Sequence, residues 1–328
     1  MLLYIYKERN KFKMREPVLL APTFKDYLWG GTRLRDEYRK KCDFDKIAES
    51  WELAAHKDGE STIASGSLAG LTLSEYIEKN GKDFLGKRAA RFDRFPIMIK
   101  LIDAKENLSV QVHPSDSYAL KNENDYGKTE VWYVVSADEG SCLYYGFNRE
   151  ITKDEFRRRI ADNTIEEVLG KVSVKPGDIF FIEPGTLHAI GKGLLICEIQ
   201  QNSNTTYRVY DYDRRGADGK PRQLHIEKAI DVTNLIVGGK GDHVPEDADR
   251  YPIAKCEYFT SEYIRSEGEC EIALDEESFR SIIVLEGDLK ICVGDFELDP
   301  HKGDSVFIPA QNGTVRVTGS GKLILSYV

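Results

Sequence analysis

A strand motif that occurs twice constrains the fold of this chain more than any other feature. The segment KPGDIFFIEPGTLHAI (175–190) resembles HKGDSVFIPAQNGTVRV (301–317) in its basic residue, Gly-Asp pair, apolar run and Pro-containing turn. Each copy has the pattern of a tight turn that leads into a strand, which ends at a second turn. Strand patterns also dominate most of the chain, so we predict a mainly β fold with two related β-barrels or jelly rolls.

Two stretches have helical patterns and are expected to decorate the barrels as short helices. They are LTLSEYIEKNGKDFLG (71–86) and TKDEFRRRIADNTIEEVLGKV (152–172). In the second, Thr152 is followed three residues later by Glu155, which is the pattern of a capping box at a helix N-terminus. The apolar residues that follow form an approximate amphipathic stripe: Phe156, Ile160, Ile165, Val168 and Leu169.

Length and charge exclude several classes of function. A chain of 328 residues usually divides into about two domains. The net charge of −9 argues against a nucleic-acid partner, and an anionic small substrate would need a local basic pocket. No apolar run reaches the ~18 residues of a membrane span. Six cysteines without CxxC spacing indicate reduced thiols of a cytoplasmic protein.

The first residues are expected to be an arm outside the fold. The opening MLLYIYKERNKFKMREP has its apolar stretch before its charges, which is the reverse of a signal peptide. Met14 is a candidate start, and the residues before it would then be dispensable.

Four polar residues on three strand-like segments predict a metal site. Gln111 and His113 lie two apart in LSVQVHP, and both point the same way because strand side chains alternate between faces. Glu130 opens the β-prone run EVWYVV, and His188 follows the Pro-Gly turn after a third strand. Two imidazoles, a carboxylate and an amide oxygen suit a divalent ion of borderline hardness. The absence of cysteine favours an open catalytic site over a closed structural one.

The second copy of the strand motif lacks these ligands. It has no histidine at the position of His188, and the strands before it, SIIVLEGDLKICVGDFEL, have no His or Gln pair. We therefore predict a metal-containing catalytic domain over 14–240 and a metal-free β domain over 241–328. The boundary falls in the glycine-rich, acidic stretch 237–250, which cannot pack well. The other histidines show no such grouping and are interpreted as structural or solvent-facing: His56, His225, His243 and His301.

The motifs around these residues match a known family. The chain resembles the cupins, and within them the short, bacterial-type class I mannose-6-phosphate isomerases. The resemblance runs from about Leu19 to Val328 and is most specific in YLWGG, ESWELAAH, LSVQVHPSD, GKTEVWYVV, PGTLHAIGKG and QQNSNTTYRVYDYDR. It implies two cupin-type barrels and a zinc-dependent aldose–ketose isomerase that interconverts mannose 6-phosphate and fructose 6-phosphate.

The resemblance also implies roles for single positions. His113, Glu130 and His188 match the metal ligands of the family, and Gln111 matches a ligand of its longer members. Arg208 in TTYRVYDYD matches the active-site arginine. These assignments imply one zinc or other divalent ion per chain.

The same residues suit isomerisation by proton transfer, which passes through a cis-enediolate with charge on O1 and O2. A divalent metal held by one carboxylate and neutral ligands keeps a net charge of about +1 and can act as a Lewis acid. Arg208 adds a permanent cation that donates to oxyanions in a planar fork. Alternation predicts that Arg208 shares its strand face with three neighbours: Thr206, Tyr210 and Tyr212. The alternative is a surface ion pair of Arg208 with Asp211 or Asp213.

Two lysines and a serine are further candidates. Lys100 is a charged residue in the apolar strand FPIMIKLID, at the position of a lysine considered as general base in relatives. Burial and a nearby metal would lower its pKa, as a base requires. Lys128 lies two residues before Glu130 and is predicted to contact the substrate. Either lysine could instead hold the phosphate or an ion pair. Ser109, two before Gln111, resembles a phosphate-contacting serine of the family.

Two other functions compete with an isomerase. A non-isomerase cupin, such as an iron oxygenase, would favour several imidazoles with open positions for oxygen. A catalytically silent, sugar-binding regulator would lack a metal ligand or the arginine, and both are present. The expected partner is a sugar phosphate, with no nucleic acid and no membrane, and the chain is expected to be a monomer or weak homodimer.

Overall fold

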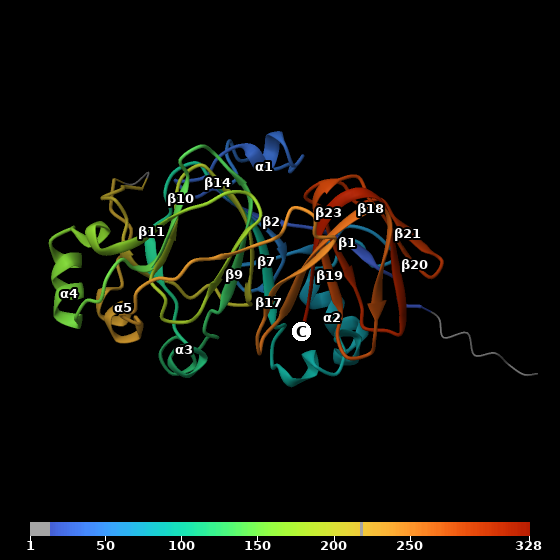
Figure 1. Cartoon of the computed structure of the whole chain (residues 1–328). Coiled ribbons are helices and arrows are strands. Elements are labelled where there is room, and N and C mark those ends of the chain that lie inside the picture. The colour runs from blue at the N-terminus through green and yellow to red at the C-terminus, as the bar shows by residue number, and fades with distance from the viewer. Residues whose placement is uncertain (1–13, 217–218) are drawn as a thin grey trace, which may run out of the picture.

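Two β units lie side by side in the computed structural model, which describes residues 14–216 and 219–328 (Figure 1). The prediction of a mainly β fold is confirmed, because strands form the framework of both units and the helices are short. The proposed N-terminal arm lies outside the described residues. Within them, no helix is long and apolar enough to cross a membrane.

The first unit consists of two facing antiparallel sheets. The larger contains, in spatial order, β16 (Asp242–His243), β12 (Asp178–Ile182), β9 (Glu130–Ala137), β14 (Leu194–Gln201), β7 (Ile97–Ala104), β3 (Glu49–Leu53) and β2 (Thr23–Lys25). The smaller contains β11 (Leu169–Ser173), β10 (Cys142–Phe147), β13 (His188–Ile190), β8 (Val110–Val112) and β15 (Tyr207–Tyr210). A separate short hairpin joins β4 (Ala55–His56) and β5 (Gly59–Glu60).

The second unit is a single sheet that also contains N-terminal strands. Its order is β17 (Arg250–Lys255), β18 (Thr260–Leu274), β23 (Gly313–Tyr327), β19 (Arg280–Gly287), β22 (Ser305–Ile308), β1 (Val18–Ala21) and β6 (Thr62–Ile63). The strands β20 (Lys290–Val293) and β21 (Phe296–Leu298) attach to β23. Strands β1 and β6 thus pair in the second unit, whereas β16 pairs in the first. A division into 14–240 and 241–328 stays a proposal.

The helices lie outside the sheets (Figure 1). Residues 71–86 form α2 (Leu73–Asn80) and the 3₁₀ helix η1 (Lys82–Leu85), and residues 152–172 form α4 (Lys153–Ala161), η3 (Ile165–Val168) and then β11. Only half of the predicted capping box at α4 is present, because the Glu155 carboxylate pairs with Arg149 instead of the N-cap amide. The remaining helices are α1 (Arg33–Asp36), η2 (Ala89–Arg91), α3 (Asp116–Asn122) and α5 (Ile226–Val232).

Side-chain alternation gives the larger sheet of the first unit two different faces. Ile102, Trp132 and Ile196 point toward the smaller sheet and form the interior of the first unit. Ile99, Val131 and Cys197 point the other way, into an apolar cluster shared with the second unit. Aromatic rings fill the centre of this shared cluster: Phe84, Phe95, Phe279 and Phe307. The second unit therefore covers the outer face of the sheet that carries the site.

A buried ion pair also connects the two units. Lys40 Nζ donates to Glu52 Oε2 at 2.9 Å and to the carbonyl oxygen of Gly303 at 2.6 Å. Glu52 lies on β3 of the first unit, whereas Gly303 precedes β22 of the second. Removing the second unit would leave this charged pair without its carbonyl partner.

Deleting residues from Gly241 onward is therefore expected to give an unstable or insoluble protein. The deletion exposes the shared apolar cluster, and burial of each large apolar side chain contributes about 1.5–3 kcal/mol against a total stability of about 5–15 kcal/mol. Solubility and circular dichroism of the truncated chain measure the effect. A chain that begins at Met14 is the control and should stay soluble. A soluble, active truncation would show that the units are independent.

Candidate metal centre

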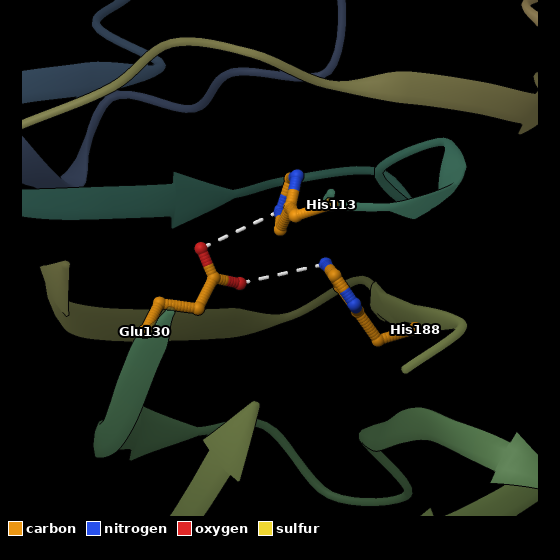
Figure 2. A group of neighbouring side chains, drawn as sticks. All are labelled: His113, Glu130 and His188. Carbon is orange, nitrogen blue, oxygen red and sulfur yellow. Dashed lines mark ion pairs between the residues drawn. The ribbon is translucent and has the colours of Figure 1, made fainter. Parts of the chain in front are cut away.

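His113, Glu130 and His188 meet inside the first unit. Their potential ligand atoms all lie within 4.8 Å of one another, and all three residues are buried. Figure 2 shows one Glu130 oxygen directed at each imidazole: Oε2 is 3.5 Å from His113 Nε2, and Oε1 is 3.4 Å from His188 Nε2. Glu130 begins β9, His188 begins β13, and His113 directly follows β8. The structure thus brings together three of the four predicted ligands.

Backbone carbonyls fix the tautomers of both histidines. His113 Nδ1 lies 3.1 Å from the oxygen of Thr205, and His188 Nδ1 lies 2.8 Å from the oxygen of Thr186. A carbonyl only accepts, so each Nδ1 carries the proton and each Nε2 presents a lone pair to the centre. This is the arrangement that a metal-binding histidine needs.

Burial and charge set the protonation states of the centre. Burial, reinforced by Lys128, lowers the pKa of His113 to about 4, and burial also lowers the pKa of His188. Burial alone would raise the pKa of Glu130, but Lys128 and His113 outweigh this effect and lower it well below its usual value. Two neutral imidazoles and one carboxylate at neutral pH are the forms that bind a divalent ion.

The hydrogen-bonding pattern of the centre fits a cation. Glu130 Oε1 and His188 Nε2 are buried without a hydrogen bond. Leaving such groups unsatisfied costs about 1–3 kcal/mol each. Lys128 Nζ is the partner of the other two ligand atoms, 2.6 Å from Glu130 Oε2 and 3.2 Å from His113 Nε2. The donor set therefore fits a divalent ion of the zinc type.

Two rows of side chains face each other beside this centre. Across the larger sheet, the registers of β9, β14, β7 and β3 align Trp132, Glu198, Lys100 and Trp51. Across the smaller sheet, the registers of β13, β8 and β15 align His188, Gln111 and Arg208. A cavity of about 220 Å³ lies there, and its polar and aromatic lining includes Tyr27, Trp29, Glu49, Lys100, Ser109, Gln111, Lys128, Glu198, Asn204, Thr206, Arg208 and Arg222. All the predicted residues that are not in the His-Glu-His cluster line this cavity.

Lys100 is surrounded by carboxylates that the sequence interpretation did not include. Its Nζ lies 3.3 Å from Glu198 Oε1 and 3.6 Å from Glu49 Oε2. Burial alone would lower the pKa of Lys100, but Glu49 and Glu198 outweigh burial and raise it. The prediction of a lowered pKa is therefore wrong for this arrangement.

Glu198 is the main functional candidate that the sequence interpretation missed. Trp132 Nε1 donates to Glu198 Oε2 at 2.9 Å, while Oε1 has no hydrogen bond. Trp51 Nε1 holds Glu49 in the same way, at 2.7 Å. The signal was available, because Glu198 interrupts the apolar run LLICEIQQ just as Lys100 interrupts its own strand.

Arg208 lies at the cavity wall and not in a surface ion pair. Its Nε donates to Ser109 Oγ at 3.3 Å, and its Nη1 donates to the oxygen of Gln223 at 2.9 Å. The predicted tyrosine neighbours on its face do not line the cavity. A bulge between Arg208 and Tyr210, followed by a left-handed backbone at Tyr212 (φ 55°), breaks the alternation.

The two facing sheets, the second β unit and the enclosed His-Glu-His group define a protein of the cupin type with a candidate metal centre. Sequence models of protein families then narrow this class to one family. The type I phosphomannose isomerase catalytic domain matches residues 18–144, and the cupin domain of mannose-6-phosphate isomerase matches residues 249–328. The chain belongs to the type I mannose-6-phosphate isomerase family, as the sequence resemblance predicts.

Individual relatives match nearly the whole chain. Mannose-6-phosphate isomerase ManA of Bacillus subtilis is 38% identical, over 95% of this chain and 99% of its own length. The enzyme of Streptococcus mutans is 36% identical, over 96% and 99%. The crystal structure of the B. subtilis mannose 6-phosphate isomerase superposes with a TM-score of 0.88 at 37% identity, covering 96% of this chain and 100% of that one. A zinc-bound mannose 6-phosphate isomerase shares the fold, with a TM-score of 0.77 at 17% identity over 95% and 99% of the chains.

Proposed function

We propose that this chain is a metal-dependent mannose-6-phosphate isomerase that interconverts mannose 6-phosphate and fructose 6-phosphate through a cis-enediolate. The observation that carries the proposal is the buried His113, Glu130 and His188 group, which adjoins a cavity lined by cations in a member of this family. The fold alone would not specify a reaction.

Zinc is the proposed metal, with one ion per chain. Neutral imidazoles and one carboxylate without thiolates suit zinc in an open site, and a relative of the same fold contains zinc. Gln111 is a candidate fourth ligand, because it faces the cavity beside His188 in the strand register. When bound, the metal supplies a Lewis acid for the substrate's O1 and O2.

The residues of the chain then bind the substrate and move the proton. Arg208 is proposed to donate to the enediolate oxygens, where its fixed positive charge is most useful. Lys100 is proposed as the catalytic lysine. Its raised pKa keeps it an ammonium, which can donate a hydrogen bond to a substrate oxygen, while Glu198, 3.3 Å away, is the neighbouring group placed to accept a proton. Lys128 and Ser109 are proposed substrate contacts at the same cavity.

An assay of the zinc-loaded chain with mannose 6-phosphate, coupled to detection of fructose 6-phosphate, tests the proposal. We expect turnover that depends on both the metal and the substrate. Binding of sugar phosphate without turnover would indicate the silent regulator. Oxygen consumption without isomerisation, in the iron-loaded chain, would indicate the oxygenase.

We propose that the enzyme works in the cytoplasm as a monomer or weak homodimer. The free thiols support a reducing compartment: Cys42, Cys142, Cys197, Cys256, Cys270 and Cys292 form no disulfide. Analytical ultracentrifugation across a range of protein concentrations measures the oligomeric state.

A further inference from the structure

Two arginines pair with one carboxylate, Asp211, beside the cavity. Asp211 pairs with both Arg214 and Arg222, and Arg222 Nε lies 2.7 Å from Asp211 Oδ2. Burial and the nearby Arg222 lower the pKa of Arg208, and within residues 14–216 and 219–328 it donates to neutral acceptors, Ser109 Oγ and the Gln223 carbonyl. Arg214 and Arg222 thus share one carboxylate, which leaves a formal excess of one positive charge beside the cavity.

The metal side of the cavity has the opposite balance. There, Lys100 and Lys128 lie among three carboxylates: Glu49, Glu130 and Glu198. Two ammonium groups against three carboxylates leave one net negative charge before any metal binds. A phosphate monoester carries a charge of about −1.5 to −2 near pH 7. Such an anion is favoured at the arginines over the lysines.

A turn with unusual backbone geometry holds the arginine cluster in place. Tyr212 and Asp213 directly follow Asp211 and have φ values of 55° and 50°, a left-handed conformation that is costly for residues other than glycine. The turn returns the chain so that the Arg214 amide donates to the Asp211 carbonyl at 3.1 Å. Burial alone would raise the pKa of Asp211, but hydrogen bonds from Arg222 and Arg214 outweigh it and lower that pKa. Asp211 therefore stays ionised as a fixed anchor.

Arg222 has donors available toward the cavity. Asp211 engages its Nε and Nη2, but Nη1 has no protein partner among the residues that the structure describes. The Arg222 side chain is 24% exposed and lines the cavity. A guanidinium held on one edge by a carboxylate, with its other edge free, is suited to bind a phosphate in a planar fork.

The position of the cluster matches the length of the substrate. His188 lies on β13, whereas Asp211, which holds Arg222, directly follows β15, two strands away in the same sheet. Two strand spacings amount to about 10 Å. The reacting carbons and the phosphate are at opposite ends of a hexose 6-phosphate, so the phosphate must lie away from the metal centre.

We propose that Arg222 binds the phosphate group of the substrate, and that Asp211 is the positioning residue that aims its guanidinium into the cavity. This inference rests on the proposed function and adds a specificity-determining residue to it. Arg222 selects phosphorylated over free sugars and acts mainly on substrate binding, because the phosphate does not change charge during the reaction.

Steady-state kinetics of Arg222→Gln and Arg222→Lys in the full, zinc-loaded chain test the proposal, with inorganic phosphate as a competitive inhibitor. Loss of a charge-assisted pair of hydrogen bonds should raise KM for mannose 6-phosphate and the phosphate inhibition constant about 10- to 100-fold in Arg222→Gln. The turnover number should change only a few-fold. Arg222→Lys keeps the charge but loses the fork, so we expect an intermediate effect.

Arg33→Gln is the matched control. Arg33 is 23% exposed and also pairs with a carboxylate, that of Asp138, but it lies outside the cavity lining. Its variant should keep KM and phosphate inhibition unchanged. An Arg222→Gln variant with wild-type KM and wild-type phosphate affinity would overturn the proposal, as would a fall in turnover alone. Calorimetric titration of wild type and both Arg222 variants with inorganic phosphate measures phosphate binding independently of turnover. A wild-type chain that binds phosphate but does not isomerise the sugar would contradict the proposed function and leave the role of Arg222 testable.

Discussion

Removing the metal with a chelator is expected to abolish isomerase turnover, and zinc or a similar divalent ion is expected to restore it. The charge that develops on O1 and O2 needs a cation at the reacting end of the sugar, where Lys100 and Lys128 are already paired with carboxylates. Lewis-acid stabilisation contributes several kcal/mol, and about 4 kcal/mol corresponds to roughly a thousandfold in rate. Full turnover in metal-free protein, verified by elemental analysis, would contradict the mechanism.

The variant His188→Ala tests whether the metal that turnover requires is bound by His113, Glu130 and His188. It should lower bound metal far below one equivalent while leaving the circular dichroism spectrum intact, because the imidazole contributes mainly a ligand and little packing. His243→Ala is the control, since His243 pairs with Asp178 at the edge strand β16, away from the centre. Stoichiometric, tightly bound metal in His188→Ala would show that the site is misassigned.

The sequence predicts the metal centre well because its geometry is local to short strands. Strand alternation and turn positions are enough to direct Glu130 and His188 into one interior, and their distances agree with a shared ion. The repeated Gly-Asp strand motif likewise predicts a second β unit. The motif does not predict that β1 pairs with β22 of that unit and brings β6 with it, since the pairing of β1 with β22 joins residues more than 200 positions apart.

The electrostatic surroundings of the site could be predicted only in part. Lys100 stands out as a charge in an apolar strand, but its pKa depends on which residues lie opposite it in β3 and β14. That register places Glu198 directly across from Lys100. Without the register, burial alone predicts a lowered pKa, which is the wrong direction.

Arg222 illustrates a second limit. It lies in a polar loop without strand or helix periodicity, so the sequence does not predict the direction of its side chain. Only the turn after β15 and the pairing with Asp211 bring it to the cavity. The same turn removes Tyr210 and Tyr212 from the face that simple alternation assigns to them.

Arg208→Lys should lower turnover far more than it weakens metal or substrate binding. Lysine keeps the charge but cannot donate in two fixed directions, as Arg208 does to Ser109 Oγ and the Gln223 carbonyl while facing the cavity. Interactions with the enediolate strengthen as charge develops on oxygen, so their loss appears in the turnover number. Losing one preorganised donor typically costs about 2.7–4 kcal/mol, or roughly a hundred- to thousand-fold in rate.

Arg280→Lys separates this effect from the general consequence of replacing an arginine that is hydrogen-bonded within the protein. Arg280 is equally tied to the protein, with Nη1 donating to the oxygen of Ser278 at 2.8 Å and Nη2 to Asp275 at 2.9 Å, but it lies in the second unit. Its variant should lose stability without losing turnover per folded, metal-loaded chain. Steady-state kinetics and metal content of both variants therefore distinguish a role in the reaction from a role in packing. Within the described residues, no other arginine shares the strand register of Gln111 and His188. Near-normal turnover in Arg208→Lys would therefore exclude Arg208, and with it any arginine of this row, from the stabilisation of the enediolate.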